Sequence, residues 1–249
     1  MKTMCVIPAR YGSTRLPGKP LLDIAGQPLI RRVYERAREA TVPERVVVAT
    51  DDRKIAAAVE AFGGEAMMTL ATHPTGTDRI AEVAATYTEY DVIVNVQGDE
   101  PLIDPDLIDR LARLMEERED MAMATAAAPL AEADYDNCNA VKVVCNLAGD
   151  AMYFSRSLIP YPRHDFAVAP QKHVGIYAYR REFLLTFADL APTPAEQTES
   201  LEQLRALEHG YRIGVIPTDR ELIGVDTLEE LLRVRALFEG GHHEASTNR

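Results

Sequence analysis

The sequence predicts an α/β protein with a mostly parallel, doubly wound sheet, and three observations support this. In the first half of the chain, short apolar runs alternate with longer amphipathic stretches, as strands alternate with helices in βαβ units. The runs are rich in valine and isoleucine, which is typical of strands buried on both faces. The length of 249 residues suits one large α/β domain or two small ones, with enough chain to bury a core.

Three strands are expected in the first half of the chain. They cover residues 4–7, 45–50 and 91–97, and the last (DVIVNVQ) is the clearest. Helical spacing of apolar residues predicts helices over residues 28–40, 52–62, 78–87 and 105–119. Asp104 is the expected N-cap of the fourth helix.

The second half contains more strands and fewer helices. Strands are expected over residues 121–128, 140–145, 152–154, 173–179 and 211–216, and helices over 182–188, 197–209 and 227–238. We interpret residues 1–239 as a single domain in which a β-rich lobe, at about residues 121–180, is inserted. The small and polar residues 240–249 are expected to form a flexible tail.

The composition argues against several classes of protein. A net charge of −12 disfavours a general nucleic-acid binder, which is normally basic. Three cysteines without metal-like spacing argue against a disulfide framework and a zinc finger. An uncharged apolar run of about 18 residues is absent, and the apolar stretch at the N-terminus is too short for a signal peptide. We therefore expect a cytoplasmic protein in a reducing compartment.

A basic loop that contains glycine follows the first strand, at residues 8–20 (PARYGSTRLPGKP). Residues 1–24 carry a net charge of +3 although the chain is acidic overall. Backbone N–H groups can approach a ligand closely at glycine, and guanidinium groups match phosphate oxygens, so the loop suits a polyphosphate. An ordinary solvated loop is the alternative.

This loop matches neither of the common nucleotide-binding fingerprints. Five residues separate Gly12 from Gly18, and Pro20 stands where a Walker A loop has the Ser or Thr that binds Mg²⁺. The dinucleotide fingerprint G-x-G-x-x-G is absent, which disfavours an oxidoreductase. A metal site would therefore have to come from elsewhere in the chain.

Two aspartates are candidates for that site. Asp99 follows the clearest strand, where a carboxylate can hold Mg²⁺ against a nucleotide triphosphate. Asp226 precedes the last expected helix, 127 positions further on. Each could instead cap a helix, although Asp104 and Thr227 compete for those two positions. Only the fold can bring the two aspartates together.

Other polar residues are weaker candidates by themselves. His173 begins an apolar strand, where a histidine is more often structural than catalytic. Arg156 and Arg163 lie beside a loop that contains proline, and they suit either an anionic substrate or solvent. Glu202 and Arg205 are three residues apart on an expected helix, so an ordinary surface ion pair is expected.

Seven motifs occur in order between residues 4 and 238. They are IPARY through LPGKPL (7–21), VNVQGDEP (94–101), AVKVV (140–144), YFSR (153–156), KHVGIY (172–177), LEQLR (201–205) and GVDT (224–227). Together they resemble those of the 3-deoxy-manno-octulosonate cytidylyltransferases, also called CMP-Kdo synthetases. The first motif is shared among sugar nucleotidyltransferases, whereas QGDEP, HVGIY and LEQLR together are much more specific.

The resemblance implies a Rossmann-like nucleotidyltransferase fold. It also implies that CMP is transferred from CTP to the anomeric hydroxyl of 3-deoxy-manno-octulosonate (Kdo), with release of pyrophosphate, for lipopolysaccharide synthesis in Gram-negative bacteria. Mg²⁺ is the implied cofactor, and a homodimer with contacts from the β-rich half is the implied assembly. Neither a nucleic-acid partner nor membrane insertion is implied.

Carried over residue by residue, the resemblance implies three sets of site residues. The catalytic set has two cations for the triphosphate, Arg10 and Lys19, and two carboxylates for Mg²⁺, Asp99 and Asp226. The implied nucleotide-binding residues are Ala9, Arg10, Gly12, Ser13, Arg15, Lys19, Thr77, Arg79 and Gln97. The implied sugar-side residues are Gln97, Arg156, Arg163, His173, Tyr177, Glu202 and Gln203.

The sequence departs from the family pattern at three positions, with Thr75 for serine, Cys138 for proline and Leu228 for proline. Proline at a helix start lacks only an N–H that the helix does not need, so its loss leaves the case for Asp226 intact. The loop at residues 157–169 varies most. A cytidylyltransferase for 8-amino-Kdo or a nonulosonic acid therefore stays an alternative, and a non-catalytic nucleotide-binding module is a more distant one.

Overall fold

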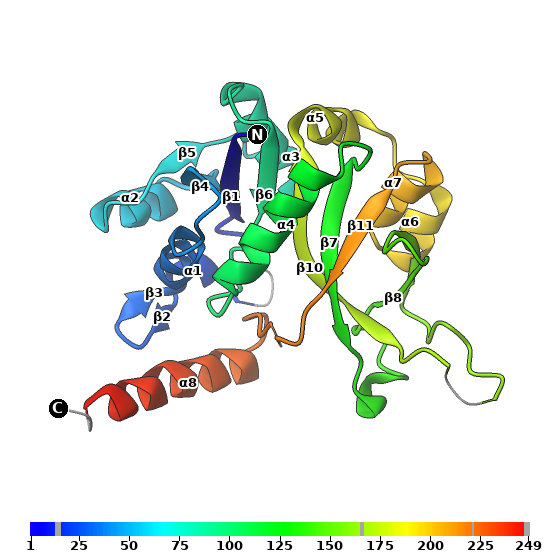
Figure 1. Ribbon diagram of the computed structural model, residues 1–249. Helices are drawn as coiled ribbons and strands as arrows, with labels where there is room; N and C mark the ends of the chain where they lie inside the picture. The colour runs from blue at the N-terminus through cyan, green and yellow to red at the C-terminus, as the bar shows by residue number, and fades with distance from the viewer. Residues whose placement is uncertain (13–15, 165–166, 221, 247–249) are drawn as a thin grey trace.

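The computed structural model describes residues 1–12, 16–164, 167–220 and 222–246, without the side chains of residues 241–246. Within these ranges nine strands form one sheet of order β11-β7-β10-β6-β1-β4-β5, with β8 paired to β10 and β9 paired to β8 (Figure 1). The strands are β1 (Thr3–Ala9), β4 (Arg45–Thr50), β5 (Ala66–Met68), β6 (Val92–Asn95), β7 (Met123–Pro129), β8 (Lys142–Cys145), β9 (Ala151–Ser155), β10 (Gln171–Arg180) and β11 (Ile213–Pro217). A separate hairpin joins β2 (Asp23–Ile24) to β3 (Gln27–Pro28).

Helices cover both faces of the sheet, as the alternating pattern predicted. The helices are α1 (Leu29–Arg38), α2 (Arg53–Ala61), α3 (Gly76–Thr86), α4 (Pro105–Glu117), α5 (Arg181–Asp189), α6 (Pro194–Glu199), α7 (Gln203–Glu208) and α8 (Leu228–Ser246). Apolar residues of α1, α2, α4 and α8 pack on one face, and those of α3, α5 and α7 pack on the other. Among the described residues no helix is both long and apolar enough to cross a membrane.

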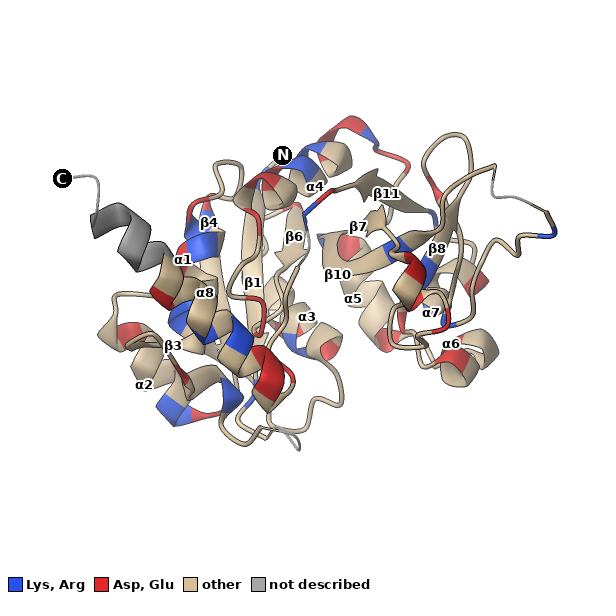
Figure 2. Ribbon diagram, turned by 90° about the horizontal axis from the view of Figure 1, so that it is seen from below, with Lys and Arg blue, Asp and Glu red and all other residues tan. Residues whose placement is uncertain are grey.

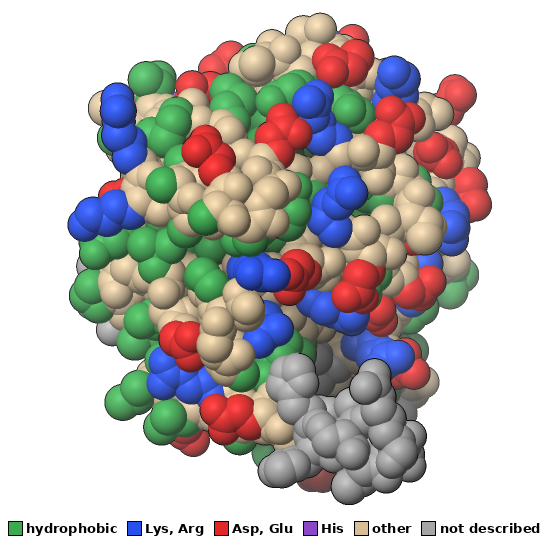
Figure 3. Space-filling model, turned by 90° about the vertical axis from the view of Figure 1, so that its left-hand side faces the viewer, with side chains coloured by type: hydrophobic (Ala, Val, Ile, Leu, Met, Phe, Trp, Pro, Cys, Tyr) green, Lys and Arg blue, Asp and Glu red, His purple; other side chains and the backbone are tan. Residues whose placement is uncertain are grey.

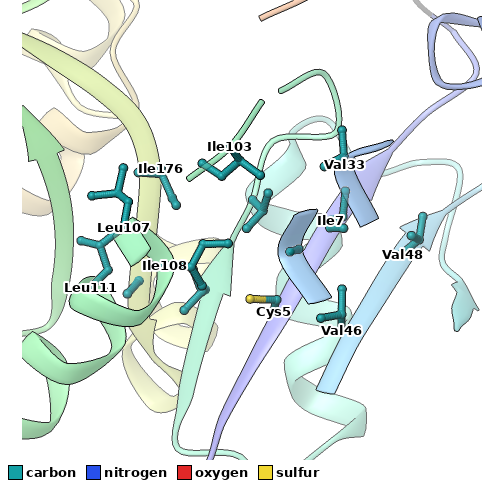
Figure 4. Packing of buried hydrophobic residues seen from close by; sticks show 14 of the residues in the cluster. Cys5, Ile7, Val33, Val46, Val48, Ile103, Leu107, Ile108, Leu111 and Ile176 are labelled. Atoms are coloured by element: carbon teal, nitrogen blue, oxygen red, sulfur yellow. The ribbon is translucent and has the colours of Figure 1, made fainter. Parts of the chain in front are cut away.

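The central strand β1 shows why the sheet is buried on both sides. It pairs in parallel with β4 and with β6. Cys5 and Ile7 join the core beneath α1 and α4, whereas Met4 and Val6 join the core beneath α3. Figure 4 shows Cys5 and Ile7 among the valines of α1 and β4 and the leucines of α4. Strands with both faces buried need apolar side chains at every position, which is the continuous run seen in the sequence.

The β-rich second half continues the same sheet. β10 runs antiparallel to β6 and to β7, and β11 runs parallel to β7. β8 and β9 branch from the far end of β10, where residues 171–172 pair with residues 142–143. The two halves therefore share one hydrogen-bonded framework, and β10 joins them (Figure 1).

Several expected elements differ from the structure. One helix was expected over residues 197–209, but α6 and α7 are separate because Ser200 has a positive φ of 51°. Strand β5 and the β2–β3 hairpin are too short to show a period in the sequence. A flexible tail was expected from residue 240, but α8 continues to Ser246, because its two glycines weaken a helix without blocking it as proline would.

Arg205 corrects another expectation. The sequence suggested a surface pair with Glu202, but Arg205 is only 7% exposed and donates two hydrogen bonds to Glu196, at 2.8 and 2.5 Å. A carboxylate oxygen of Glu202 lies 3.7 Å from the Arg205 guanidinium. The break between α6 and α7 turns Arg205 inward, toward a carboxylate nine positions earlier. Burial alone would raise the pKa of Glu196, but the hydrogen bonds and charge of Arg205 outweigh it and lower that pKa.

Side chains of both signs are interspersed on the face that Figure 3 shows. The described part of this face therefore carries no field of a single sign, despite the net charge of −12. The acidic balance of the chain does not by itself point to a partner on this face.

Replacing Arg205 tests the buried pair. Arg205→Met leaves Glu196 without its cation and should lower the free energy of unfolding by about 3 to 5 kcal/mol. The stabilisation should be present above pH 4.5 and disappear as the pH falls through the lowered pKa of Glu196. Urea unfolding at pH 7 and at a series of decreasing pH values below 4.5 measures both effects. Arg220→Met removes an arginine that is 75% exposed beside Asp104 and should cost at most about 1 kcal/mol. Equal losses in the two variants would contradict the buried pair.

Candidate active site

A cavity of about 320 Å³ lies at the carboxyl ends of β1 and β6. This is the edge where ligands bind in open α/β sheets. Figure 2 looks onto this edge, with α3 and α8 on either side of β1. The cavity is lined by Pro8, Ala9, Arg10, Lys19, Pro20, His73, Pro74, Thr75, Gly76, Arg79, Gln97, Gly98, Asp99 and Asp226.

The loop after β1 brings Arg10 and Lys19 to this cavity. Gly18 has a positive φ of 67°, and its N–H donates to the carbonyl of Tyr11 across the loop. A Cβ at Gly18 would come within 3.3 Å of the Tyr11 ring, so a larger residue would both strain the backbone and crowd the ring. The Lys54 ammonium lies over that ring, 5.2 Å from its centroid. The turn thus restrains the backbone at Gly18, the residue directly before Lys19.

The loop after β6 places Asp99. Gly98 packs against the end of β1, where an added Cβ would meet the carbonyl oxygen of Pro8 at 2.6 Å. Only glycine allows the two strand ends to approach this closely. The carbonyl oxygen of Asp99 accepts a hydrogen bond of 2.9 Å from the N–H of Val225, which ties the loop before α8 to the loop after β6. Asp226, the next residue, is therefore held beside Asp99.

Helix capping does not occupy either aspartate. Asp104 accepts from the N–H of Asp106 and caps α4. Thr227 accepts from the N–H of Glu230, and the Glu230 carboxylate accepts in return from the N–H of Thr227. These bonds form a capping box at the start of α8. The side chains of Asp99 and Asp226 are therefore not needed as caps.

Lys19 joins the two aspartates. Its ammonium donates to Asp99 at 2.6 Å and to Asp226 at 2.8 Å, although the three residues are up to 207 positions apart. The Lys19 side chain is 15% exposed. Burial opposes its charge, but the charges and hydrogen bonds of the two carboxylates outweigh that effect and raise the pKa of Lys19. The predicted convergence of the aspartates is therefore present, while their role as metal ligands stays a prediction.

The donor set fits Mg²⁺. Mg²⁺ is usually held by one or two carboxylates together with substrate phosphates and water. Among the described residues no group of three or more His, Cys, Asp or Glu side chains could hold a metal ion. The two carboxylates would therefore need phosphate oxygens to complete a Mg²⁺ shell. Mg²⁺ held by Asp99 and Asp226 would compete with Lys19 for the two carboxylates.

Some nucleotide-side candidates have side chains exposed toward the cavity, and others are already hydrogen-bonded within the protein. Arg10 lines the cavity with an exposed side chain. Arg79 also lines the cavity, but its guanidinium is buried and bonded to Asp51 and Thr69. Ala9 ends β1 and Gly12 lies in the exposed loop that follows. Ser13 and Arg15 lie outside the described residues.

The cavity wall also includes residues 73–76, the segment that leads into α3. His73 lies in this segment, and its ring nitrogen is 2.5 Å from the carboxylate of Glu82. Thr75 caps α3, and its hydroxyl accepts from the N–H of Asp78. Thr75 therefore supplies the hydroxyl that a serine would have supplied. The pair of His73 with Glu82 was not predicted, because nothing in a spacing of nine residues indicates a pair.

The sugar-side candidates form a second cluster on the α3 and α7 side of the sheet. The Thr77 hydroxyl donates to Glu202, so Thr77 connects α3 to α7 and does not line the cavity. Burial raises the pKa of Tyr177, and the nearby charge of Glu202 adds to this. The His173 ring lies 5.4 Å from the Tyr177 ring. Gln97 connects the cluster to the cavity, because its amide lines the cavity wall and donates to the carbonyl of Gly175 at 3.0 Å.

The two arginines expected near a substrate carboxylate differ from one another. Arg156 donates from all three guanidinium nitrogens to backbone carbonyls, those of Glu199, Cys138 and Ser200. It therefore holds the turn between α6 and α7. Arg163 is exposed on the loop that follows β9 and does not line the cavity.

Gln203, the remaining candidate, begins α7. It is buried beside Glu202, the residue that Thr77 contacts. Arg156 thus fixes the turn that leads directly into both sugar-side candidates of α7.

Comparison with known proteins shows similarity to cytidylyltransferases over nearly the whole chain. A family model described as cytidylyltransferase matches residues 4–213. The 3-deoxy-manno-octulosonate cytidylyltransferase of Syntrophotalea carbinolica is 52% identical over 96% of this chain and 100% of its own length. That of Fusobacterium nucleatum is 49% identical over 94% of this chain and 96% of its own. The solved structure of a CMP:2-keto-3-deoxy-manno-octonic acid synthetase complexed with CTP covers 97% of this chain and 100% of that chain, with 47% identity and a TM-score of 0.94.

Removing the Lys19 ammonium tests the bridge between the carboxylates. Lys19→Met should lower the free energy of unfolding by about 1 to 3 kcal/mol at pH 7 in the presence of a chelator, because two like charges remain close together. The difference should persist up to pH 10.5 and vanish only as the pH rises through the raised pKa of Lys19. Adding Asp99→Asn should recover part of the loss. Thermal unfolding provides the measurement.

Lys54→Met is the matched control, because Lys54 is exposed and contacts the Tyr11 ring instead of the carboxylates. A loss as large as that of Lys19→Met would mean that the general positive field, and not the bridge, is responsible.

Proposed function

The chain belongs to the cytidylyltransferase family, among the 3-deoxy-manno-octulosonate cytidylyltransferases, and we propose that it transfers CMP from CTP to the anomeric hydroxyl of Kdo. Family membership rests on the match over residues 4–213 and on relatives about half identical along nearly the whole chain. The products are CMP-Kdo and pyrophosphate, and the activated sugar serves lipopolysaccharide synthesis. A cytoplasmic location is part of the proposal, since CTP is a cytoplasmic metabolite and the three cysteines are free.

One observation carries the proposal for the nucleotide. Two carboxylates, Asp99 and Asp226, and two cations, Lys19 and Arg10, line a single cavity at the carboxyl end of the sheet. A bound triphosphate needs cations for its oxygens and carboxylates for its metal ion. A module that only senses a nucleotide has no need for a carboxylate pair held in this way.

The mechanism follows from the charges in the cavity. The Kdo hydroxyl attacks the α-phosphorus of CTP while the bond to pyrophosphate breaks in line with it. Arg10 and Lys19 neutralise the charge that develops on the departing pyrophosphate. Asp99 and Asp226 would hold Mg²⁺, which when bound lowers the pKa of the attacking hydroxyl and offsets phosphate charge. Such a reaction depends on position and charge more than on covalent catalysis.

The second cluster supports the proposal that an acid sugar binds on the side of Gln97 that faces away from the nucleotide. Gln97 lines the cavity and contacts β10, so a sugar near its amide would lie between the nucleotide and the residues His173, Tyr177 and Glu202. Hydroxyl, imidazole and carboxylate groups gathered at one place suit a polyhydroxylated ligand.

The direct test is release of pyrophosphate from CTP, Kdo and Mg²⁺, with CMP-Kdo identified by mass. Asp99→Asn should reduce turnover by a factor on the order of 10² to 10³, as the loss of one electrostatic partner can do. Asp106→Asn, a change at an exposed aspartate on α4, should leave turnover unchanged. Full turnover by folded Asp99→Asn would remove the metal role. A panel with 8-amino-Kdo and nonulosonic acids would identify another acid sugar as the substrate.

We also propose that two copies associate through the β8–β9 hairpin. The hairpin exposes Leu147, Met152 and Tyr153, and Met152 is 64% exposed. Large apolar side chains gathered on one hairpin are typical of a surface that another protein covers. The occupant we propose is a second copy, in line with the homodimer that the family resemblance implies.

Met152→Glu should weaken this association at least about tenfold, because a charge would be buried without a partner. Sedimentation velocity over a range of concentrations measures the change. Leu237→Glu on α8, at a residue that is 48% exposed and far from the hairpin, should leave the dimer intact (Figure 1). A wild-type protein that sediments as a monomer at micromolar concentration would exclude the proposal.

A further inference from the structure

A bulge in β10 separates His173 from Tyr177. Val174 pairs with Ala126 of β7, and the next pair is Tyr177 with Thr125. Three steps along β10 therefore match one step along β7, which leaves the two residues between Val174 and Tyr177 without a ladder partner on β7. Bulges of this kind re-aim side chains and are frequent beside active sites.

The hydroxyl of Thr125 fills the inside of this bulge. Thr125 is 0% exposed, and its Oγ1 lies 3.0 Å from the carbonyl oxygen of Val174 and 2.8 Å from that of Ile176. The same Oγ1 lies 3.0 Å from Nε2 of His173. One hydroxyl thus has three close polar neighbours in a site closed to solvent.

Counting donors and acceptors fixes the direction of these bonds. A hydroxyl has one proton to donate, and a carbonyl oxygen can only accept. If the Thr125 proton pointed at His173, both carbonyl oxygens would face Oγ1 with no hydrogen between them, which is costly in a buried site. The proton therefore goes to a carbonyl, and the remaining contact requires Nε2 of His173 to donate to Oγ1.

We propose that Thr125 is a positioning residue that holds His173 as its Nε2–H tautomer, so that Nδ1 becomes a bare acceptor for a hydroxyl of the sugar acid. This deepens the proposed function and rests on it for the identity of the ligand. Within the part of the chain that the structure describes, no hydrogen bond reaches Nδ1 of His173. Nδ1 therefore keeps an unused acceptor position.

The surroundings keep the imidazole fixed and neutral. Phe154 packs edge-on against the ring, with centroids 5.1 Å apart, and Tyr177 lies on another side at 5.4 Å. Burial lowers the pKa of His173 to about 4, so the ring carries no charge at neutral pH. A neutral acceptor recognises a hydroxyl, whereas a charged imidazolium would instead recognise the carboxylate of the sugar acid. His173 therefore recognises a hydroxyl group of the substrate.

The first test is the tautomer in the protein without ligand. ¹⁵N NMR of histidine-labelled protein distinguishes a protonated ring nitrogen from a bare one, and His173 is assigned from the signal that disappears in His173→Gln. Wild type should show a protonated Nε2 and a bare Nδ1. Thr125→Val removes the acceptor for Nε2–H and should produce a mixture of tautomers, while Thr125→Ser should retain the wild-type spectrum. A protonated Nδ1 in wild type would overturn the proposal, even if Thr125→Val failed to fold.

The second test is kinetic. Thr125→Val should raise KM for Kdo about three- to tenfold, the range expected for one neutral hydrogen bond, with little change in kcat or in KM for CTP. Thr125→Ser should restore KM. Thr3→Val is the matched control, because Thr3 is another buried strand threonine, and its hydroxyl has no hydrogen-bond partner to lose.

Two outcomes separate this inference from the proposed function. An unchanged tautomer and an unchanged KM for Kdo in folded Thr125→Val would overturn the role of Thr125 while CMP-Kdo is still formed. Absence of CMP-Kdo in the wild-type reaction would overturn the proposed function, and the NMR result would still decide the tautomer.

Discussion

The candidate site depends on holding two like charges side by side. Asp99 and Asp226 repel each other unless a cation lies between them, and Lys19 supplies that cation through bonds of 2.6 and 2.8 Å. The surrounding backbone is arranged so that this is possible. Gly98 allows the end of β6 to approach β1, and the bond from Val225 to the Asp99 carbonyl brings in the start of α8. Three segments from distant parts of the chain thus meet at one ammonium group.

Strand β10 connects this charged cavity to the second cluster. At its bulge the Gly175 carbonyl accepts from the Gln97 amide, and the carbonyl oxygens of Val174 and Ile176 lie within 3.0 Å of the Thr125 hydroxyl. Gln97 lines the cavity, and Thr125 contacts His173. Because the same bulge positions both side chains, a change in its shape would affect the nucleotide side and the sugar side together.

Three of the described arginines have mainly structural roles. Arg205 is paired with Glu196, Arg156 holds the turn between α6 and α7, and Arg79 is bound to Asp51. A guanidinium that is removed from water needs several acceptors, and in each case nearby carboxylates or carbonyls provide them. Arginine in a motif is therefore weak evidence for a ligand contact until its partners are known. Among the arginines that the structure describes, Arg10 lines the cavity with an exposed side chain and is the one best placed for a phosphate.

The fold class, the parallel first half of the sheet and the main helices on its faces could be predicted from the amino-acid sequence, because hydrophobic period and helix caps are local properties. The sequence also singled out the basic loop, Asp99 and Asp226, since these residues follow strands or precede a helix. It did not determine that α6 and α7 are separate, because that depends on one left-handed residue, Ser200.

Which polar groups face one another could not be predicted and depends on how the folded chain packs. Three contacts illustrate this: Lys19 with Asp99 and Asp226, Arg205 with Glu196, and Thr125 with His173. The spacing of these residues along the sequence follows neither the helix period nor the strand period. Such contacts arise from the packing of whole elements. Hydrogen bonds and charges act over a few ångströms in space, and the linear sequence does not record that distance.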